Sequence, residues 1–424
     1  MPGIKRIGLI AGAGLLVLLA LAGAQTIYVT FASGLAEARK AYRAADTDLA
    51  IDRLTAATGS PFLLPHQKAE AYRLRGETFY VLKEDEKALA DLSEAIRLAP
   101  SAASYRLRSS VHERGGQYDE AIADLTEALA LAPSDMPSRL GRALLHESYL
   151  NHHAVIEDYG LIIEHYPAFA SHARRKRGTA YAELGEIEKA ISEIAAIPLD
   201  GSYDYQGHVG RGIEFDNIAA YDRAKQEFDA AIRLQPRNAR ALLARGVSGI
   251  AAGNFEGALR DLDAATGLDP DESFAHYGRG RANYHLGRMA VARKELEAAL
   301  AANPSYIFPA LWLHLVHLRT GGPQPAILQS HAESFGVTWP RPIFNHFIGA
   351  LDREALFDKA AEGTPFVQRE QLCEVHFFLG AALAARGDRR AKEPLEEARK
   401  ICPRAFVEYS ASLHELNRLA AGQR

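Results

Sequence analysis

Small residues recur along this chain at steps of about 34 residues, and this regularity restricts the fold more than length or composition does. The repeated positions are Gly76, Ser109, Ala143, Gly178, Gly212, Gly246 and Gly280. In one period, Ala88 follows Gly76 after twelve residues, Leu92 comes four residues later, and Ala95 and Pro100 complete the unit. Most other periods keep this order. A constant period of this length indicates an array of stacked structural units.

Each repeated position has a physical reason. The spacing of four and three residues places Ala88, Leu92 and Ala95 on one face of a helix. Small residues such as Gly76 let two antiparallel helices approach closely, and the leucine fills the space beside them. Proline cannot continue a helix, so Pro100 ends the second helix of its unit. Glycines between the expected helices predict turns at Gly115–Gly116, Gly185, Gly253 and Gly287.

This pattern resembles the tetratricopeptide repeat. The clear units are roughly 69–102, 102–135, 171–204, 205–238, 239–272 and 273–306, and weaker ones are 136–169, 307–335 and 34–60. The resemblance implies an all-α fold, a right-handed superhelical solenoid of helix-turn-helix repeats. We expect about eight or nine repeats over residues 34–335, and a C-terminal helical region over 336–424 with one further degenerate repeat and a capping helix.

The first 33 residues predict export or membrane anchoring. Lys5 and Arg6 precede an apolar run from Ile7 to Ala24, and Ala22-Gly23-Ala24 is typical of a signal-peptide cleavage site. The longer apolar run 7–32 is also enough for a transmembrane anchor. Both readings stay open. Because basic residues remain on the cytoplasmic side, either one predicts that the rest of the chain is periplasmic.

The C-terminal part carries a narrower resemblance. The segments 373–380, 387–388 and 405–416, together with 274–312, are similar to the NlpI family of bacterial outer-membrane lipoproteins. That resemblance implies a helical, dimeric adaptor that docks periplasmic proteases and peptidoglycan enzymes. This chain differs because no cysteine follows the apolar run for lipidation, and because it has more N-terminal repeats.

The repeat register predicts where a partner binds. First helices line the concave face of such a solenoid. Early repeats place Arg73, Arg106 and Arg175 there. Later repeats give an apolar and aromatic stretch, formed by Val209, Ile213, Leu243, Val247, Phe274, Tyr277, Arg281 and Tyr284. Tyrosine and arginine dominate interface energetics, so we expect a partner peptide or helix to dock on this stretch. The alternative is that the C-terminal segment or a second subunit covers it.

Two cysteines, Cys373 and Cys402, open and close the helices of the last expected repeat. Antiparallel helices bring those two ends together, so a disulfide between them is sterically feasible. Two buried free thiols are the alternative, and the sequence does not decide between them.

The sequence contains no motif of an active site. It has no phosphate-binding Gly-Lys-Ser/Thr loop, no His-Glu-x-x-His and no Gly-x-Ser-x-Gly. His314 and His317 have a spacing that can hold a metal, but a third ligand is not evident. The basic run 174–177 fits either an acidic partner or lipid phosphates, or a solvated face with nearby glutamates. The net charge of −4 argues against a nucleic-acid partner.

These observations favour a non-catalytic scaffold of the cell envelope without a metal or cofactor. Its expected partners are envelope enzymes or assembly factors, the membrane if the N-terminal segment is uncleaved, and a second copy of the chain in a homodimer. One alternative is an assembly component of a secretion or polysaccharide-export machine. Another is an enzyme with a helical body, which would need a catalytic domain for which the sequence shows no motif.

Overall fold

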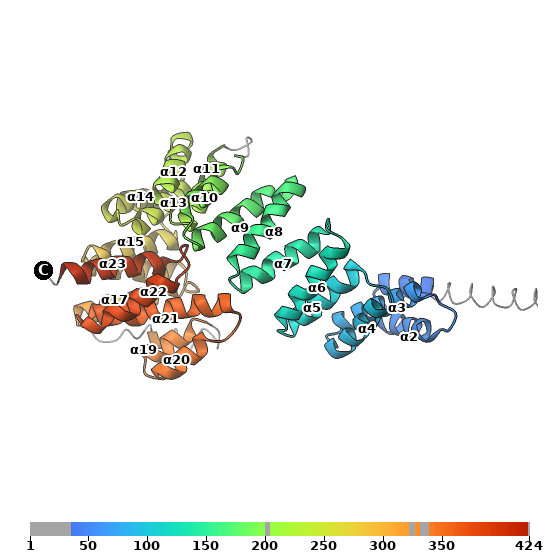
Figure 1. Ribbon diagram of the computed structural model, residues 1–424. Helices are drawn as coiled ribbons and strands as arrows, with labels where there is room; N and C mark the ends of the chain where they lie inside the picture. Colours follow the sequence, from blue (N-terminus) through green and yellow to red (C-terminus); the bar gives the residue numbers. More distant parts are fainter. Residues whose placement is uncertain (1–34, 200–203, 322–325, 327, 331–338, 423–424) are drawn as a thin grey trace, which may run out of the picture. The chain divides into compact units, whose positions relative to one another are not determined.

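Figure 1 shows the computed structural model of the chain, in which every described element is a helix. The described residues are 35–199, 204–321, 326, 328–330 and 339–422. They divide into two compact units at Leu145, and each unit is described by itself. No helix of the described residues is long and apolar enough to cross a membrane.

Several predictions concern residues outside the described ranges. The apolar export or anchor segment, residues 1–33, lies there entirely. The boundary between residues 335 and 336 also falls outside them. These predictions therefore remain predictions.

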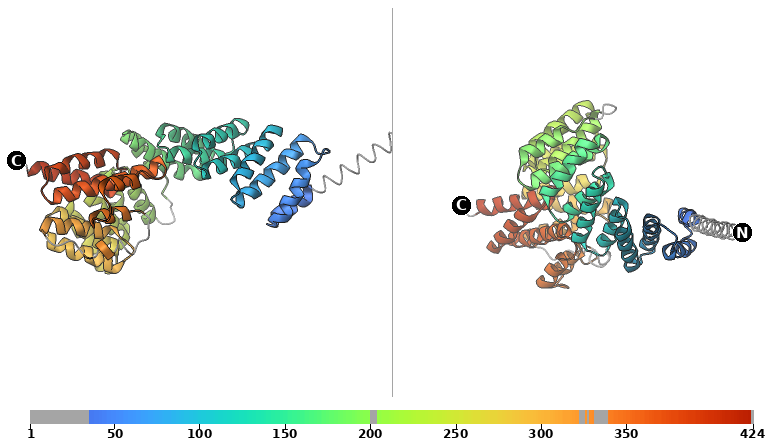
Figure 2. Two further views of the ribbon diagram at one scale, coloured as in Figure 1. Left: turned by 90° about the horizontal axis from the view of Figure 1, so that it is seen from below. Right: turned by 45° about the vertical axis from the view of Figure 1, so that its right-hand side comes forward.

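The first unit is a row of antiparallel helix pairs (Figure 2). After a helical stretch over residues 35–43, its helices are α2 (Thr47–Gly59), α3 (Pro65–Val81), α4 (Asp85–Leu98), α5 (Ala102–Arg114), α6 (Tyr118–Leu131) and α7 (Met136–Ser148), which crosses the division. Local sequence fixes where these helices begin. The Asp46 carboxylate caps α2 by accepting from Leu49 N, and Ser101 caps α5 in the same way.

The second unit continues the pairs. They are α8 (His152–His165), α9 (Ala170–Glu183), α10 (Ile187–Ala195), α11 (Asp204–Asn217), α12 (Tyr221–Leu234), α13 (Ala239–Ala251), α14 (Phe255–Leu268), α15 (Ser273–His285), α16 (Met289–Ala302) and α17 (Phe308–Thr320). The terminal helices are α19 (Arg341–Phe347), α20 (Arg353–Ala360), α21 (Pro365–Ala385), α22 (Lys392–Ile401) and α23 (Val407–Ala421).

One core joins the later repeats of the second unit to its terminal helices. It runs from Tyr277 in α15 to Ala411 in α23 and includes the fully buried rings of Trp312 and Phe377, whose centroids are 5.7 Å apart. Figure 1 shows α21 beside α17, in agreement with the packing of these two helices on one another. The terminal helices therefore belong to the same packed body as the repeats that precede them.

The predicted turns between paired helices are confirmed. Gly116, Gly185, Gly253 and Gly287 have positive φ angles between 73° and 80° and follow the first helices α5, α9, α13 and α15. Lys83, Leu150 and Ala219 adopt the same left-handed backbone at the equivalent turns of other pairs, where no glycine is present. The turn geometry thus belongs to the repeat, and glycine makes it easier to adopt.

The close approach of paired helices at the repeated small residues is also confirmed. A Cβ atom built on Gly212 would lie 2.6 Å from Cε1 of Phe228, and one on Gly280 would lie 2.7 Å from Cδ2 of Leu296. In each case the large residue of the second helix fills the space that the glycine leaves open. The 16-residue offset between them is the sequence form of this contact.

We expect Gly212→Ala to lower the free energy of unfolding of the second unit by about 1 to 3 kcal/mol, because the Phe228 ring occupies the space of the added methyl group. Gly210 lies on the same helix with nothing within 4 Å of an added Cβ, so Gly210→Ala should instead stabilise by up to about 1 kcal/mol. Urea unfolding followed by circular dichroism measures both. Equal effects of the two substitutions would contradict the close packing.

Candidate binding surface on the inner helix faces

The structure divides the eight predicted partner-binding residues into two groups. Partly or largely exposed are Ile213, Leu243, Val247 and Phe274. Buried are Val209, Tyr277, Arg281 and Tyr284. The exposed group lies on the first helices α11, α13 and α15, and the side chain of Phe274 is the most accessible of them at 48%. These four residues form the inner surface, the term used below.

The four buried residues are core contacts between neighbouring helices. The Tyr277 ring packs edge-on against Tyr306 at 5.2 Å, and the Tyr284 ring packs against Trp312 at 5.3 Å. Val209 joins a small cluster with alanines of α12 and α13. Aromatic residues at these positions fill the space toward the next helix. They are therefore inaccessible to a partner in this conformation, unlike the exposed group.

Arg281 is buried and packs against two aromatic rings. Its guanidinium carbon lies 5.4 Å from the ring centroids of both Tyr277 and Trp312. Such cation–π contacts partly compensate a buried charge. Arg281 thus stabilises the core and offers no free guanidinium on the surface.

The C-terminal segment reaches the ends of several first helices within the second unit. The Nε2 atom of His414 lies 3.0 Å from the carbonyl oxygen of Ile250 at the end of α13. Arg319 of α17 pairs with Glu415 of α23 at 2.6 Å, and Arg404 Nε donates to the Ala182 carbonyl oxygen at 3.0 Å. These contacts involve residues at or near the ends of α9, α13 and α17 and none of the eight predicted residues, so covering of that surface by the C-terminal segment stays an alternative. The first helices hold α23 along their ends.

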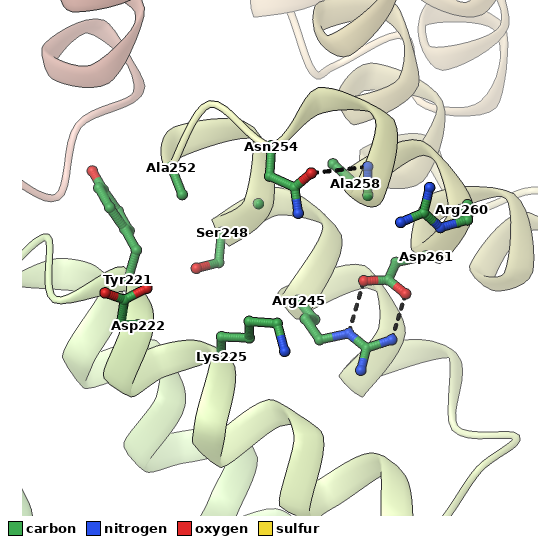
Figure 3. Close-up of a pocket in the computed structure, with 12 residues that line it drawn as sticks. Tyr221, Asp222, Lys225, Arg245, Ser248, Ala252, Asn254, Ala258, Arg260 and Asp261 are labelled. Atoms are coloured by element: carbon green, nitrogen blue, oxygen red, sulfur yellow. Dashed lines mark hydrogen bonds and ion pairs between the residues drawn. The ribbon is translucent and has the colours of Figure 1, made fainter.

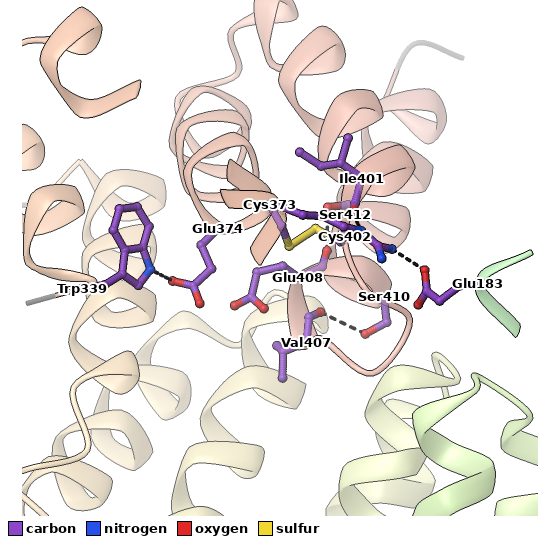
Figure 4. The surroundings of a disulfide bond; sticks show 11 residues. Glu183, Trp339, Cys373, Glu374, Ile401, Cys402, Val407, Glu408, Ser410 and Ser412 are labelled. Carbon is purple, nitrogen blue, oxygen red and sulfur yellow. Dashed lines mark hydrogen bonds and ion pairs between the residues drawn. A yellow bond between two sulfur atoms is a disulfide. The ribbon is translucent and has the colours of Figure 1, made fainter. Parts of the chain in front are cut away.

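Two buried glutamates meet where the terminal helices join the repeats. Figure 4 shows the carboxyl groups of Glu374 in α21 and Glu408 in α23 pointing toward one another. Glu374 Oε2 accepts a hydrogen bond from Trp339 Nε1 at 2.9 Å. Burial, together with the neighbouring Glu408 carboxyl, raises the pKa of Glu374 to about 8. Burial also raises the pKa of Glu408, while the positive charge of Arg281 opposes that change.

The structure joins Cys373 and Cys402 in a disulfide (Figure 4). Their Cα atoms are 4.8 Å apart, and the bond connects the middle of α21 to the residue that ends α22. Both cysteines are buried. The bond therefore fixes the terminal helix pair directly beside the two glutamates.

His314 and His317, the pair considered as a metal site, lie on one helix but differ in burial. His314 is buried beside the Phe347 ring at 4.6 Å, and burial lowers its pKa to about 4. His317 on the same helix is only partly buried. Within the described ranges, no three His, Cys, Asp or Glu side chains are grouped to hold a metal ion.

The basic run 174–177 is paired with carboxylates of the second unit. Arg174 and Arg177 contact Glu193, Lys176 contacts Glu147 at 2.6 Å, and Arg175 lies 3.7 Å from Glu214. These partners are not the glutamates nearest in sequence, because helix pairing brings more distant ones into reach. The run is therefore engaged in contacts between neighbouring helices.

An arginine–carboxylate ladder is a regular feature that our sequence reading missed. In repeat after repeat, an arginine directly before the small residue pairs with an acid 16 residues later in the second helix. The pairs are Arg75 with Asp91, Arg108 with Asp124, Arg177 with Glu193, Arg211 with Glu227, Arg245 with Asp261 and Arg279 with Glu295. These arginines and acids recur in the sequence with the same 34-residue period, so a search for periodic charges would have located the pairs.

Figure 3 shows one ladder pair beside a hollow of about 420 Å³ between α12, α13 and α14. Arg245 forms two hydrogen bonds with Asp261 and a third with Asp229 of α12 at 2.7 Å. These bonds raise the pKa of Arg245 and connect three helices. Lys225, Arg245 and Arg260 line this hollow together with Asp222 and Asp261, and Lys225 and Arg245 are paired with Asp229 and Asp261. The ladder pair thus connects neighbouring helices beside the hollow.

Comparisons with known proteins agree with this architecture. One tetratricopeptide-repeat model matches residues 35–103, 212–272 and 248–307, and a second matches residues 102–135. No curated protein matches the chain.

Among solved structures, a tetratricopeptide repeat protein from Parabacteroides merdae is 20% identical, with 59% of this chain and 99% of that chain covered and a TM-score of 0.40. Yeast Tom70 is 17% identical over 84% of this chain and 88% of its own, with a TM-score of 0.35. The structure of Naa15/Naa10 bound to HypK-THB is 14% identical over 92% and 67%, with a TM-score of 0.44. The family models show that the chain contains tetratricopeptide repeats, over residues 35–135 of the first unit and residues 212–307 of the second.

Proposed function

We propose that this protein is a non-catalytic scaffold that binds a segment of a partner protein on the inner surface of its second unit. One observation carries the proposal. The first helices α11, α13 and α15 present Ile213, Leu243, Val247 and Phe274 with accessible apolar surface, although Leu243 and Val247 also pack partly against the core and Phe274 packs on Tyr306. Exposed apolar residues that recur on one face of an array indicate a binding surface.

The kind of partner follows from the same face. The first helices already contact a helix of this chain, α23, through His414 and Glu415. The first helices thus already accommodate one helix, α23. Their surface is therefore suited to a second helical or extended segment beside it. We therefore expect a partner that contributes a short segment with apolar side chains and not a folded domain with a broad flat face.

The cellular setting is part of the proposal. Lys5, Arg6 and the apolar run 7–32 support export with periplasmic exposure, either after cleavage behind Ala24 or with the segment retained as an anchor. The C-terminal resemblance to the NlpI family supports an adaptor for envelope enzymes, which includes association of two copies. An assembly role in a secretion or polysaccharide-export machine would use the same surface with different partners. Determining the mature N-terminus, Met1 against Gln25, separates the two membrane readings.

Site-specific photo-crosslinking tests the proposed surface. A photoreactive amino acid at position 213 or 274 should capture the same partner in the native host. The same amino acid at position 291 should not, because Val291 lies on a second helix, α16, with a matched exposure of 43% against 48% for Phe274. Capture only from position 291, or the same capture from all three, would refute the inner surface as the binding site.

A further inference from the structure

A second surface lies at the end of the second unit, away from the inner surface residues. A groove of about 1200 Å³ runs between α22 and α23. On α22 it is lined by Lys392, Glu396 and Arg399, which share one helical stripe. On α23 it is lined by Leu413 and Leu416, with Ala420 one further turn along. The groove therefore has a charged wall and an apolar wall.

The charge of the groove lining is strongly one-sided. Its cations are Arg389 before α22, Lys392, Arg399 and Lys400 on α22 and Arg418 on α23, and its acid is Glu396. Lys392, Lys400 and Arg418 are paired with Glu396, Glu397 and Glu415 at 3.6, 3.4 and 2.7 Å. Arg389 and Arg399 are exposed and take part in none of the ion pairs formed within the described ranges. The groove thus keeps uncompensated positive charge.

The apolar wall is the exposed side of α23, and the opposite side of this helix packs against the core. Glu408, Ala411, Ser412 and Glu415 face the core and are buried, whereas the side chain of Leu413 is 38% exposed. α23 packs on α21 and α22 as a first helix packs on the preceding pair.

We propose that this groove binds an acidic amphipathic helix of a partner protein, which lies between α22 and α23. Its apolar edge would contact Leu413 and Leu416, and its acidic edge would face Arg389 and Arg399. The stripe from residue 413 to residue 420 is roughly 10 Å long at 1.5 Å per residue, so two to three helical turns suffice. Recognition of an amphipathic helix through its apolar face is an established mode of peptide binding.

The shape of the site favours a helix over a membrane surface. Basic and apolar residues together also suit anionic lipid, but an interfacial helix presents them on one convex face. Here the basic stripe and the apolar stripe belong to different helices and enclose a groove between them. A rod-shaped ligand fills such a groove, while a flat bilayer surface contacts only its rim.

Fluorescence anisotropy with designed peptides tests the proposal on the full chain. The first probe is a stapled three-turn helix with leucines along one edge and glutamates beside it, and the second has lysine at every glutamate position. We expect the glutamate peptide to bind at least about tenfold more tightly. Arg389→Glu with Arg399→Glu should weaken it by a similar factor. The matched control, Arg260→Glu with Lys294→Glu, changes the same net charge on the exposed second helices α14 and α16 and should leave binding unchanged.

Other outcomes would overturn the proposal. These are equal binding of both peptides, no saturable binding, or binding of the glutamate peptide that the groove variant keeps. Binding of phosphatidylglycerol vesicles that the groove variant alone loses, without peptide binding, would assign the site to a membrane. A concentration-dependent dimer that the groove variant alone abolishes would assign it to a second copy of the chain. Circular dichroism of each variant confirms that the fold is retained.

Discussion

Replacing Cys373 and Cys402 together by alanine is expected to lower the free energy of unfolding of the second unit by about 3.6 kcal/mol. The estimate follows from the sequence separation of 29 residues, because a cross-link of this length removes loop-closure entropy from the unfolded chain. Alanine keeps the buried positions apolar. The loss should fall first on α21 to α23, since the disulfide holds α21 to the end of α22.

The two tryptophans of the chain make this measurement local. Trp312 contacts the Phe377 ring of α21, and Trp339 hydrogen-bonds Glu374 of the same helix. Urea unfolding followed by tryptophan fluorescence therefore reports on the second unit and not on the first. As a control, wild-type protein unfolded in the presence of a reductant should have a free energy of unfolding close to that of the variant. A variant as stable as the oxidised wild type would contradict the stabilising role of the bond.

The repeats could be predicted from the sequence because their contacts are local and periodic. The contact of Gly212 with Phe228 spans 16 residues, and the same offset recurs in the neighbouring repeats. The turns at Gly185 and Gly253 are local as well. Such features leave a regular trace in one sequence, so the helix pairs and their packing followed from it.

The accessibility of the predicted surface could not be predicted in the same way. It depends on which side chains pack over each residue, such as Tyr306 on Tyr277 and Trp312 on Tyr284. Each of these contacts occurs only once, so it gives no periodic pattern in the sequence. The register placed Tyr277 and Arg281 on first helices, but the neighbouring helix covers them. The sequence alone therefore does not distinguish a binding residue from a core residue when an aromatic residue occupies such a position.

The buried glutamates could not be located from sequence for the same reason. Glu374 and Glu408 are ordinary helix residues until α21 and α23 pack together. Their proximity is a property of the terminal helices, where the period is weakest. The free-energy cost of burying them is offset in part by Trp339 and by the positive charge of Arg281.

We expect the Glu374→Gln variant to gain stability relative to wild type as the pH rises from about 5 to 9, because the variant lacks the proton that Glu374 loses over this range. The pKa of Glu374 is raised from 4.5 to about 8 in the folded chain, so the folded state binds a proton that the unfolded state has lost. The stabilising contribution is complete below pH 4.5 and is lost as the pH rises through about 8. At about 1.4 kcal/mol per unit, the variant should exceed wild type by about 3 to 5 kcal/mol at pH 9.

The groups around the carboxyl pair determine how this experiment is read. Glu370 and Glu408 disfavour a charge on Glu374, the Trp339 hydrogen bond favours it, and Arg281 acts mainly on Glu408. Buried histidines such as His285 titrate in the opposite sense, since a lowered pKa reduces stability as the pH falls. The difference between variant and wild type cancels that background. Glu393→Gln, which removes an exposed carboxylate nearby in the sequence, is the matched control and should keep the wild-type dependence. Parallel curves for Glu374→Gln and wild type would mean that Glu374 is already ionised at neutral pH, with its charge accommodated by groups around it.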